Sequence, residues 1–406
     1  MALGLFVTPR RFLISSWVPQ FCEVPECHTL SATPSAPPSL EPRTEGGLSI
    51  RDVLDCGCDV MTCCFNDEGT LLAVGLTNGT IQVYQPADST FLYQLNSSET
   101  LQSSLPVTSL RFQHRDNRER HCLLLATYAS GCVRVWHVAG GRSLCCVQEG
   151  GRDSAGGRGR QTLSLSLSPS GDRFITAGSD CQLHLYDTET RQRIHTCRAS
   201  HSMSLMDGHR FRVFAVTFHP EKEDEFISGG WDNTVQFWDS KQQHSVRKLS
   251  GPHICGDALQ IDPSTNQILS GSWRKERALE IWDYNSGEKV TEISDDQDGH
   301  SLIYSCHWLG ADQMVAGGSE SNVCRVIDRY TKLSLGRLVD LPGGVYSTAV
   351  CSAGQCEGLI AASSRDCVYL LERTTAPTTH YSDRENYRSQ DALLPLREYS
   401  SHAALL

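Results

Sequence analysis

The cysteines and histidines of this sequence are the first candidates for chemistry, because thiolate and imidazole groups bind metal ions when they cluster at fixed spacing. The closest clusters are Cys22 with Cys27 and His28, and Cys56 with Cys58, Cys63 and Cys64. Neither cluster contains two paired Cys-x-x-Cys units, the spacing that is typical of structural zinc sites. We therefore expect no metal site and no cofactor, and we interpret the cysteines as small buried side chains.

Three motifs of well-known catalytic sites are also absent from the sequence. It contains no GxxxxGK[ST] phosphate loop, no HExxH metal pair and no GxSxG nucleophile turn. The residues that remain as candidates must therefore be judged by the elements that position them.

Composition narrows the class of partner. The net charge is -11, which argues against binding to duplex nucleic acid, since that affinity comes largely from neutralising phosphates. The apolar run near the N-terminus is interrupted by Arg10 and Arg11 and is too short to span a membrane. The 18 cysteines are scattered through the chain, without a convincing secretory signal. We expect reduced thiols, a location in the cytoplasm or nucleus, and neither nucleic-acid binding nor membrane insertion.

An internal repeat organises the chain. Residues 175–187 and 227–239 align without a gap, and both end in an aromatic residue followed by aspartate. The residues equivalent to Trp238 are Tyr84, Trp136, Tyr186, Trp282, Ile327 and Leu371. With Trp238 in its place in the chain, the seven positions follow one another at intervals of 52, 50, 52, 44, 45 and 44 residues. This period fits seven four-stranded units.

Alternating apolar residues within each unit predict strands rather than helices. The expected opening strands are Val60–Phe65, Val107–Phe112, Leu163–Leu167, Val213–Phe218, Ala258–Ile261, Ile303–Trp308 and Val345–Val350. The Gly- and Arg-rich segment 150–160 between the second and third units is expected to be a mobile loop.

The copies resemble the WD-repeat family, with Gly208-His209 opening and Trp238-Asp239 closing the fourth copy, and Trp282-Asp283 closing the fifth. The resemblance implies an all-β fold, a single seven-bladed WD-repeat β-propeller over residues 47–372. Strand 48–54 is expected to close the ring as the outer strand of the last blade. Residues 1–46 are expected to be a disordered leader, with a transit peptide as the alternative, and residues 373–406 a disordered tail.

The resemblance also assigns structural roles. It implies a buried hydrogen-bonded network in the fourth blade, formed by His209, Ser228, Asp232 and Trp238. Such a network stabilises a fold only when every member is satisfied. On this interpretation His209 is structural and not a catalytic base.

Partners of this family usually bind one face of the ring, around the central channel, and two positions in each blade sample that face. Large aromatic residues occupy these positions only in blades four to seven, namely Phe214, Trp231, Trp273, Tyr304 and Tyr346. The basic residues beside them include Arg212, Arg274 and Arg365. Because arginine pairs with carboxylate or phosphate through two parallel bonds, we expect an acidic or phosphorylated protein segment as partner. The alternative is that the aromatic side chains only line the channel wall.

Three functions follow from these features. The first is a non-catalytic scaffold for protein–protein interaction. The second is the substrate receptor of a ubiquitin ligase, for which the family pattern places Arg two residues after the closing Asp; only Lys241 approaches it, beside Glu189 and Asn285. The third, a propeller enzyme, is disfavoured because Asp257 is the only acid among the channel-facing candidates, and carboxylate catalysis usually needs a pair.

Overall fold

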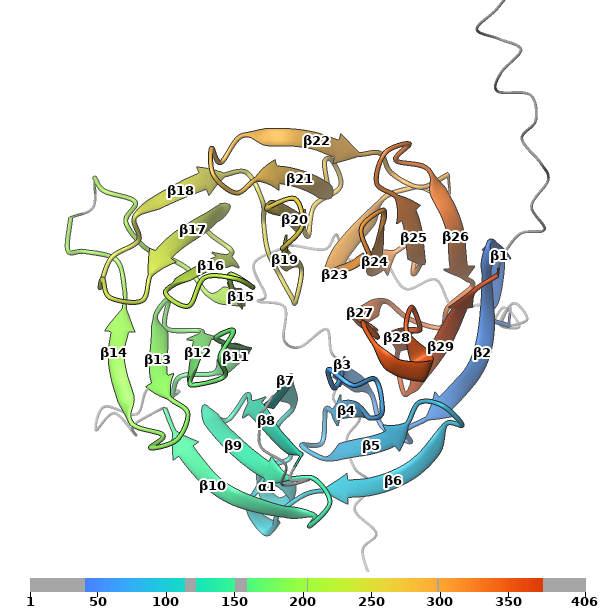
Figure 1. The fold of residues 1–406 in the computed structure, drawn as a ribbon, viewed down its shortest axis with the longest axis horizontal. Helices are drawn as coiled ribbons and strands as arrows, with labels where there is room; N and C mark the ends of the chain where they lie inside the picture. Colours follow the sequence, from blue (N-terminus) through green and yellow to red (C-terminus); the bar gives the residue numbers. More distant parts are fainter. Residues whose placement is uncertain (1–40, 114–121, 150–158, 203, 298, 375–406) are drawn as a thin grey trace, which may run out of the picture. The chain divides into compact units, whose positions relative to one another are not determined.

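Strands account for nearly all of the regular structure. The computed structural model describes residues 41–113, 122–149, 159–202, 204–297 and 299–374. Within these ranges 29 strands form seven antiparallel sheets, which stand around a central opening like the blades of a propeller (Figure 1). The predicted seven-bladed β-propeller is therefore confirmed. Residues 1–40 and 375–406, most of the expected leader and tail, lie outside the described residues.

The first four blades each contain four consecutive strands, which are hydrogen-bonded in chain order from the innermost strand to the outermost strand. Blade one comprises β3 (Val60–Phe65), β4 (Leu72–Leu76), β5 (Ile81–Gln85) and β6 (Thr90–Leu95), and blade two comprises β7 (Val107–Gln113), β8 (Leu123–Tyr128), β9 (Cys132–His137) and β10 (Arg142–Gln148). Blade three comprises β11 (Thr162–Leu167), β12 (Arg173–Gly178), β13 (Leu183–Asp187) and β14 (Arg193–Cys197), and blade four comprises β15 (Val213–Phe218), β16 (Glu225–Gly230), β17 (Thr234–Asp239) and β18 (Arg247–Ser250). A short helix, α1 (Ser98–Ser103), joins blades one and two.

The last three blades complete the ring. Blade five comprises β19 (Leu259–Asp262), β20 (Gln267–Gly271), β21 (Leu279–Asp283) and β22 (Lys289–Ile293). Blade six contains β23 (Ser301–Leu309), β24 (Gln313–Glu320), β25 (Cys324–Asp328) and β26 (Ser334–Val339), and blade seven contains β27 (Val345–Val350), β28 (Ile360–Ser364) and β29 (Cys367–Arg373), with a 3-10 helix at Gly354–Cys356. The predicted opening strands of blades one, four and seven coincide with β3, β15 and β27.

Two strands near the N-terminus join the end of the chain to its beginning. Strand β2 (Leu48–Asp55) pairs antiparallel with β29 and is the outermost strand of blade seven (Figure 1). Strand β1 (Arg43–Gly46) pairs with β26 and gives blade six a fifth strand. The regular structure therefore begins before residue 47, where we expected the leader to end, and it extends to Arg373 at the other end.

The β1 strand is held by charge as well as by its backbone. Nε of Arg43 donates to Asp340 over 2.7 Å, and Arg337 forms an ion pair with Glu45. Arg337 also binds Asp296 over 2.6 Å, so the ion pairs continue into the loop after β22. These side chains explain why a polar four-residue segment adds to the sheet, although its sequence lacks the alternation of a buried strand.

The hydrophobic core lies between the blades. Seven clusters of buried apolar side chains are found among the described residues, one at each boundary between neighbouring blades. Trp238 of blade four, for example, packs in the cluster shared with blade three, while Trp282 of blade five packs in the cluster shared with blade four. Each blade therefore buries both faces of its sheet and depends on two neighbours for its core.

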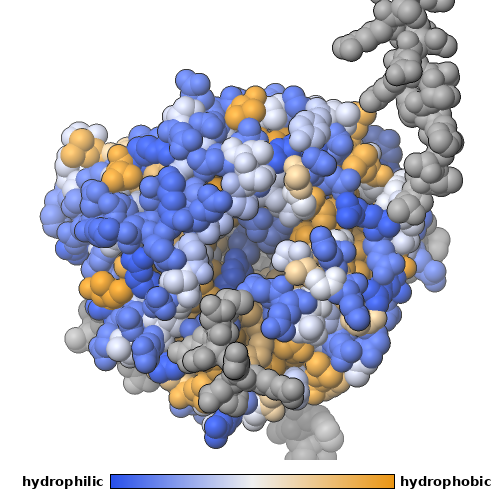
Figure 2. Space-filling model, viewed as in Figure 1, coloured by the Kyte–Doolittle hydropathy of each residue, from blue (hydrophilic) through white to orange (hydrophobic). Residues whose placement is uncertain are grey.

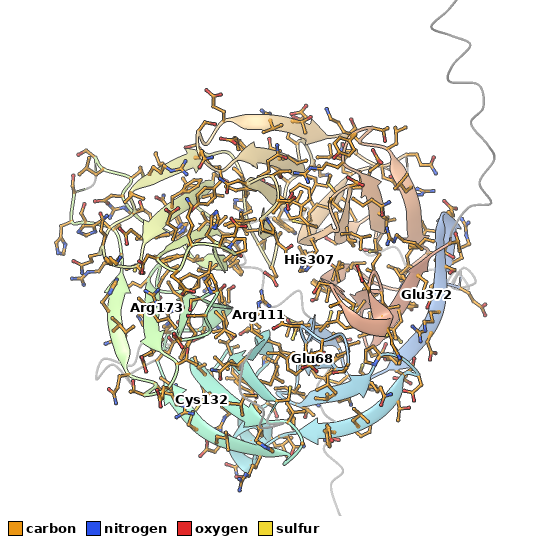
Figure 3. The ribbon with its side chains drawn as sticks, viewed as in Figure 1. Glu68, Arg111, Cys132, Arg173, His307 and Glu372 are labelled. Atoms are coloured by element: carbon orange, nitrogen blue, oxygen red, sulfur yellow. A yellow bond between two sulfur atoms is a disulfide. The ribbon has the colours of Figure 1, made fainter. Side chains whose placement is uncertain are left out.

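Most cysteines of the described residues are free thiols, and many are buried in these clusters. Cys132 and Cys146 differ from the expectation of free thiols, because they form a disulfide between β9 and β10 (Figure 3). Among the described residues there is no group of three or more His, Cys, Asp or Glu side chains that could hold a metal ion. The cluster of Cys22, Cys27 and His28 lies outside those residues. No helix in the described part of the chain has the length and apolar character of a membrane span.

Candidate functional site

Blade four brings together the four residues assigned to its structural network. Oγ of Ser228 lies 2.7 Å from Nε2 of His209 and accepts a 2.8 Å hydrogen bond from Nε1 of Trp238. Nδ1 of His209 lies 2.8 Å from the carboxylate of Asp232, which also accepts a 2.8 Å bond from Thr234. Burial raises the pKa of Asp232, but the hydrogen bond and charge of His209, together with the hydrogen bonds from Thr234 and the backbone of Arg210, outweigh it and the pKa is lowered overall. Both nitrogens of His209 are engaged, so the side chain serves the fold.

Replacement of Asp232 by Ala is expected to lower the free energy of unfolding by about 1–3 kcal/mol, because it leaves the buried Nδ1–H of His209 without an acceptor. Urea unfolding of the purified chain measures this loss. Glu189→Ala is the matched control, since this carboxylate is exposed and removal of an exposed side chain changes stability by about 0.5 kcal/mol or less. Equal stabilities of the two variants would contradict the role of the network.

Blade three has a different buried network. The carboxylate of Glu149 is fully buried and accepts a 2.8 Å hydrogen bond from the hydroxyl of Tyr186. It lies 3.2 Å from Nδ1 of His184 and 3.3 Å from Nε of Arg160. Arg160 in turn forms an ion pair with Asp180. Burial raises the pKa of Glu149, but the hydrogen bond with His184 and the charge of Arg160 outweigh it and lower the pKa to about 2.

Arg160 takes the place that His209 has in blade four. Each follows a glycine, Gly159 or Gly208, before the opening strand of its blade, and each contacts the aspartate of the following turn. The expectation of a mobile loop over residues 150–160 is therefore wrong at its last residue, because Arg160 is buried. Residues 150–158 lie outside the described residues.

The five aromatic residues predicted to face a partner gather into one continuous row, which we call the aromatic arc. Phe214 and Trp231 stack with ring centroids 5.1 Å apart, and Tyr304 and Tyr346 lie 4.9 Å apart. Trp273 extends the second pair, since its Nε1 donates a 2.9 Å hydrogen bond to the hydroxyl of Tyr304. All five side chains are half-buried, so the arc is accessible along its length.

His253 completes the aromatic arc and was not predicted. Its ring lies 6.2 Å from that of Trp231, at an interplanar angle of 13°, and 6.5 Å from that of Trp273. Its Nδ1 lies 2.8 Å from the side-chain oxygen of Asn233, to which it donates. Burial, and then the charge of Arg274, lower the pKa of His253. The imidazole is therefore neutral near pH 7 and acts as another flat ring in the stack.

The three predicted basic residues have different environments. Arg274 is committed to its own blade, since it binds Glu280 over 2.7 Å and donates to the carbonyl of Gly251. Arg212 lies 5.9 Å from the ring of Trp231 and donates to Gln161, and Arg365 is exposed beside Tyr346. Neither Arg212 nor Arg365 forms an ion pair with any residue in the ranges that the structure describes, so both remain available to an external anion.

Comparison with known proteins agrees with this geometry. The family profile described as "WD domain, G-beta repeat" matches residues 51–85, 159–187 and 200–239, which include the network of blade four and, apart from Glu149, that of blade three. The chain contains WD repeats and folds as a seven-bladed β-propeller. Among its relatives is the guanine nucleotide-binding protein subunit beta of Arabidopsis thaliana, 24% identical over 280 residues, a match that covers 65% of this chain and 68% of the relative.

Two further relatives are longer proteins in which the match covers a minor part. Protein tipD of Dictyostelium discoideum is 23% identical over 223 residues, covering 53% of this chain and 33% of tipD. Dynein axonemal intermediate chain 4 of Homo sapiens is 27% identical over 238 residues, covering 52% of this chain and 26% of that protein. These likenesses concern the propeller.

The residues missed from the sequence lie outside the two positions per blade that were compared. His253 belongs to the connection between β18 and β19, and its sequence signal is weak, a single His in Gly-Pro-His. Glu149 follows the outer strand of blade two but serves blade three, so only the pairing of the two blades shows its role. The Gly159-Arg160 pair could have been recognised in the sequence, because it has the place in blade three that Gly208-His209 has in blade four.

Proposed function

We propose that this propeller is a non-catalytic scaffold, and that the aromatic arc of blades four to seven binds an acidic or phosphorylated segment of another protein. One observation carries the proposal: six rings from four blades form a continuous, half-exposed row, and near each end lies an arginine that has no ion-pair partner among the described residues. Aromatic and arginine side chains are enriched among the residues that dominate binding energy at protein interfaces.

The orientation of the rings favours an electron-rich ligand. Phe214, Trp231 and His253 lie nearly parallel, with interplanar angles of 29° and 13°, so their faces are covered by one another. A ligand that approaches the aromatic arc therefore meets ring edges. The edge of an aromatic ring carries partial positive charge and the face carries partial negative charge. Carboxylate, phosphate and carbonyl oxygens fit such a surface better than ammonium groups do.

The two alternative functions gain no support from the site. Lys241, the residue nearest to the ubiquitin-ligase pattern, forms an ion pair with Asp224 over 2.6 Å. Asp257 accepts its hydrogen bond from Arg111, and no second carboxylate or histidine is hydrogen-bonded to it among the described residues. The names of the relatives include a subunit of a guanine nucleotide-binding protein and a chain of dynein, and a scaffold role is consistent with these names.

The double variant Trp231→Ala/Trp273→Ala is expected to lose at least ten-fold in the recovery of specific partners from cell lysates, because it removes the two largest rings of the aromatic arc. The measurement is quantitative affinity purification with tagged full-length chains, beside a check that the melting temperature is unchanged.

The matched control is Phe91→Ala/Tyr330→Ala, which removes two aromatic side chains that are 49% and 71% exposed and lie outside the aromatic arc. Full retention of every partner by the tryptophan variant, or an equal loss in the control, would reject the aromatic arc as the binding site.

A further inference from the structure

An ion pair crosses the central channel beside the aromatic arc. Nη2 of Arg111, on β7 of blade two, lies 2.9 Å from Oδ2 of Asp257, directly before β19 of blade five. Blades two and five lie across the ring from each other, and Figure 3 shows Arg111 and, on β23, His307 beside the central opening. The space-filling view shows a hollow at the centre of the ring with hydrophilic residues in its depth (Figure 2).

The two charges of this pair compensate each other. Burial raises the pKa of Asp257, but the charge and the hydrogen bond of Arg111, with an electrostatic contribution from His307, together outweigh it and the pKa is lowered. Burial likewise lowers the pKa of Arg111, but Asp257 outweighs it and the pKa is raised. Burial lowers the pKa of His307, also beside the channel, although the charge of Asp257 opposes this shift. The charges of Arg111 and Asp257 cancel each other.

The hydrogen-bonding capacity of the pair is only partly used. Arg111 donates to Asp257 and to the carbonyl of Leu110, which leaves other N–H groups of its five without a partner among the described residues. Asp257 accepts through Oδ2, and its Oδ1 has no donor within the same residues. Each side chain is 26% exposed, so the pair can be reached from the channel.

We propose that the central channel, at the Arg111–Asp257 pair, receives one side chain of the segment bound on the aromatic arc, and that this side chain is a carboxamide, Asn or Gln. The inference rests on the proposed function and specifies its ligand. A carboxamide oxygen accepts from Arg111 while its NH2 group donates to Asp257.

Charged and apolar side chains fit this place less well. A carboxylate or an ammonium group would bring a net charge next to a pair that is already compensated, and burial of an uncompensated charge is strongly unfavourable. An apolar side chain would displace water from donors and acceptors that it cannot satisfy. Only a neutral group with both a donor and an acceptor replaces the water without either loss.

Selection of a phage-displayed random peptide library on the immobilised full-length chain tests this inference. We expect the binders to share a position at which Asn or Gln is at least ten-fold enriched over Asp, Glu, Lys and Arg. A synthetic binder with that Gln changed to Glu or to Lys should bind at least ten-fold more weakly, measured by titration calorimetry. Asp257→Asn should shift the preference toward Asp and Glu, and Arg111→Gln toward Lys and Arg.

The exchange variant Arg111→Asp/Asp257→Arg keeps the ion pair in case a single variant fails to fold. It should retain the preference for a carboxamide, because the donors and acceptors are only exchanged. A shared position occupied by charged or apolar residues would overturn the inference. If those binders still depend on Trp231 and Trp273, the proposed function stands while the channel inference falls; if no binder depends on the two tryptophans, both fall.

Discussion

Removal of residues 1–55 is expected to abolish the cooperative unfolding transition of the propeller. The deletion takes away β1 and β2, and with them the outermost strands of blades six and seven. Leu48 and Leu54 of β2 are 4% and 5% exposed, and burial of two such side chains contributes roughly 3–6 kcal/mol. Since domains are stable by only about 5–15 kcal/mol, this loss is a large part of the margin, and the loss of the β2–β29 ladder adds to it. Circular dichroism during heating is the measurement.

A deletion of residues 1–40 is the control for this prediction, because it removes none of the described strands. A melting curve of the longer deletion that superimposes on that of the control would show that β2 does not close the ring. A further deletion of residues 1–46 removes β1 alone and should give a smaller decrease in melting temperature, since β1 pairs over only four residues.

The second large effect is expected from Glu149→Ala, which should lower the free energy of unfolding by about 3–5 kcal/mol, because it leaves the buried guanidinium of Arg160 beside an empty space. The hydroxyl of Tyr186 loses its acceptor at the same time. Urea unfolding measures the loss, with Glu189→Ala as the exposed control in the same blade. A decrease below about 1 kcal/mol would show that the network contributes little.

The pH dependence of stability checks the same residue. Because the folded state holds the pKa of Glu149 at about 2, below the usual 4.5, its contribution is fully present above pH 4.5 and is lost as the pH falls toward 2. Glu149→Gln cannot titrate, so the difference in unfolding free energy between the parent chain and this variant should shrink over that interval. A difference that stays constant from pH 6 to pH 3 would contradict the lowered pKa.

The sequence was sufficient to predict the ring because each blade repeats the same local alternation. The opening strands of blades one, four and seven could be read to the residue, since each runs between a buried valine and a turn. Strand β1 could not be read. Arg-Thr-Glu-Gly has no apolar alternation, and its partners in blade six lie almost three hundred residues away in the chain. Only the closed ring brings Glu45 to Arg337.

The candidate site also combines residues that could be predicted from the sequence with contacts that could not. Trp231 and Trp273 were predictable because they occupy equivalent places before the turn of their blades. Their contacts were not predictable, since the stack passes through His253 and across blade boundaries. Arg111 was not singled out at all, because its partner Asp257 comes from the opposite side of the channel. Features that repeat in every blade can be read from sequence, whereas features that join different blades require coordinates.

The pairing of β1 with β26 and of β2 with β29 has a consequence for synthesis of the protein. Both strands leave the ribosome before any blade, but their partners β26 and β29 are among the last strands to be made. Strands β1 and β2 therefore remain unpaired while blades one to five assemble. Contacts between residues so far apart in the sequence form slowly. During that interval the newly made polypeptide exposes strand edges that invite wrong partners, so chaperone dependence should concentrate in the final stage of translation.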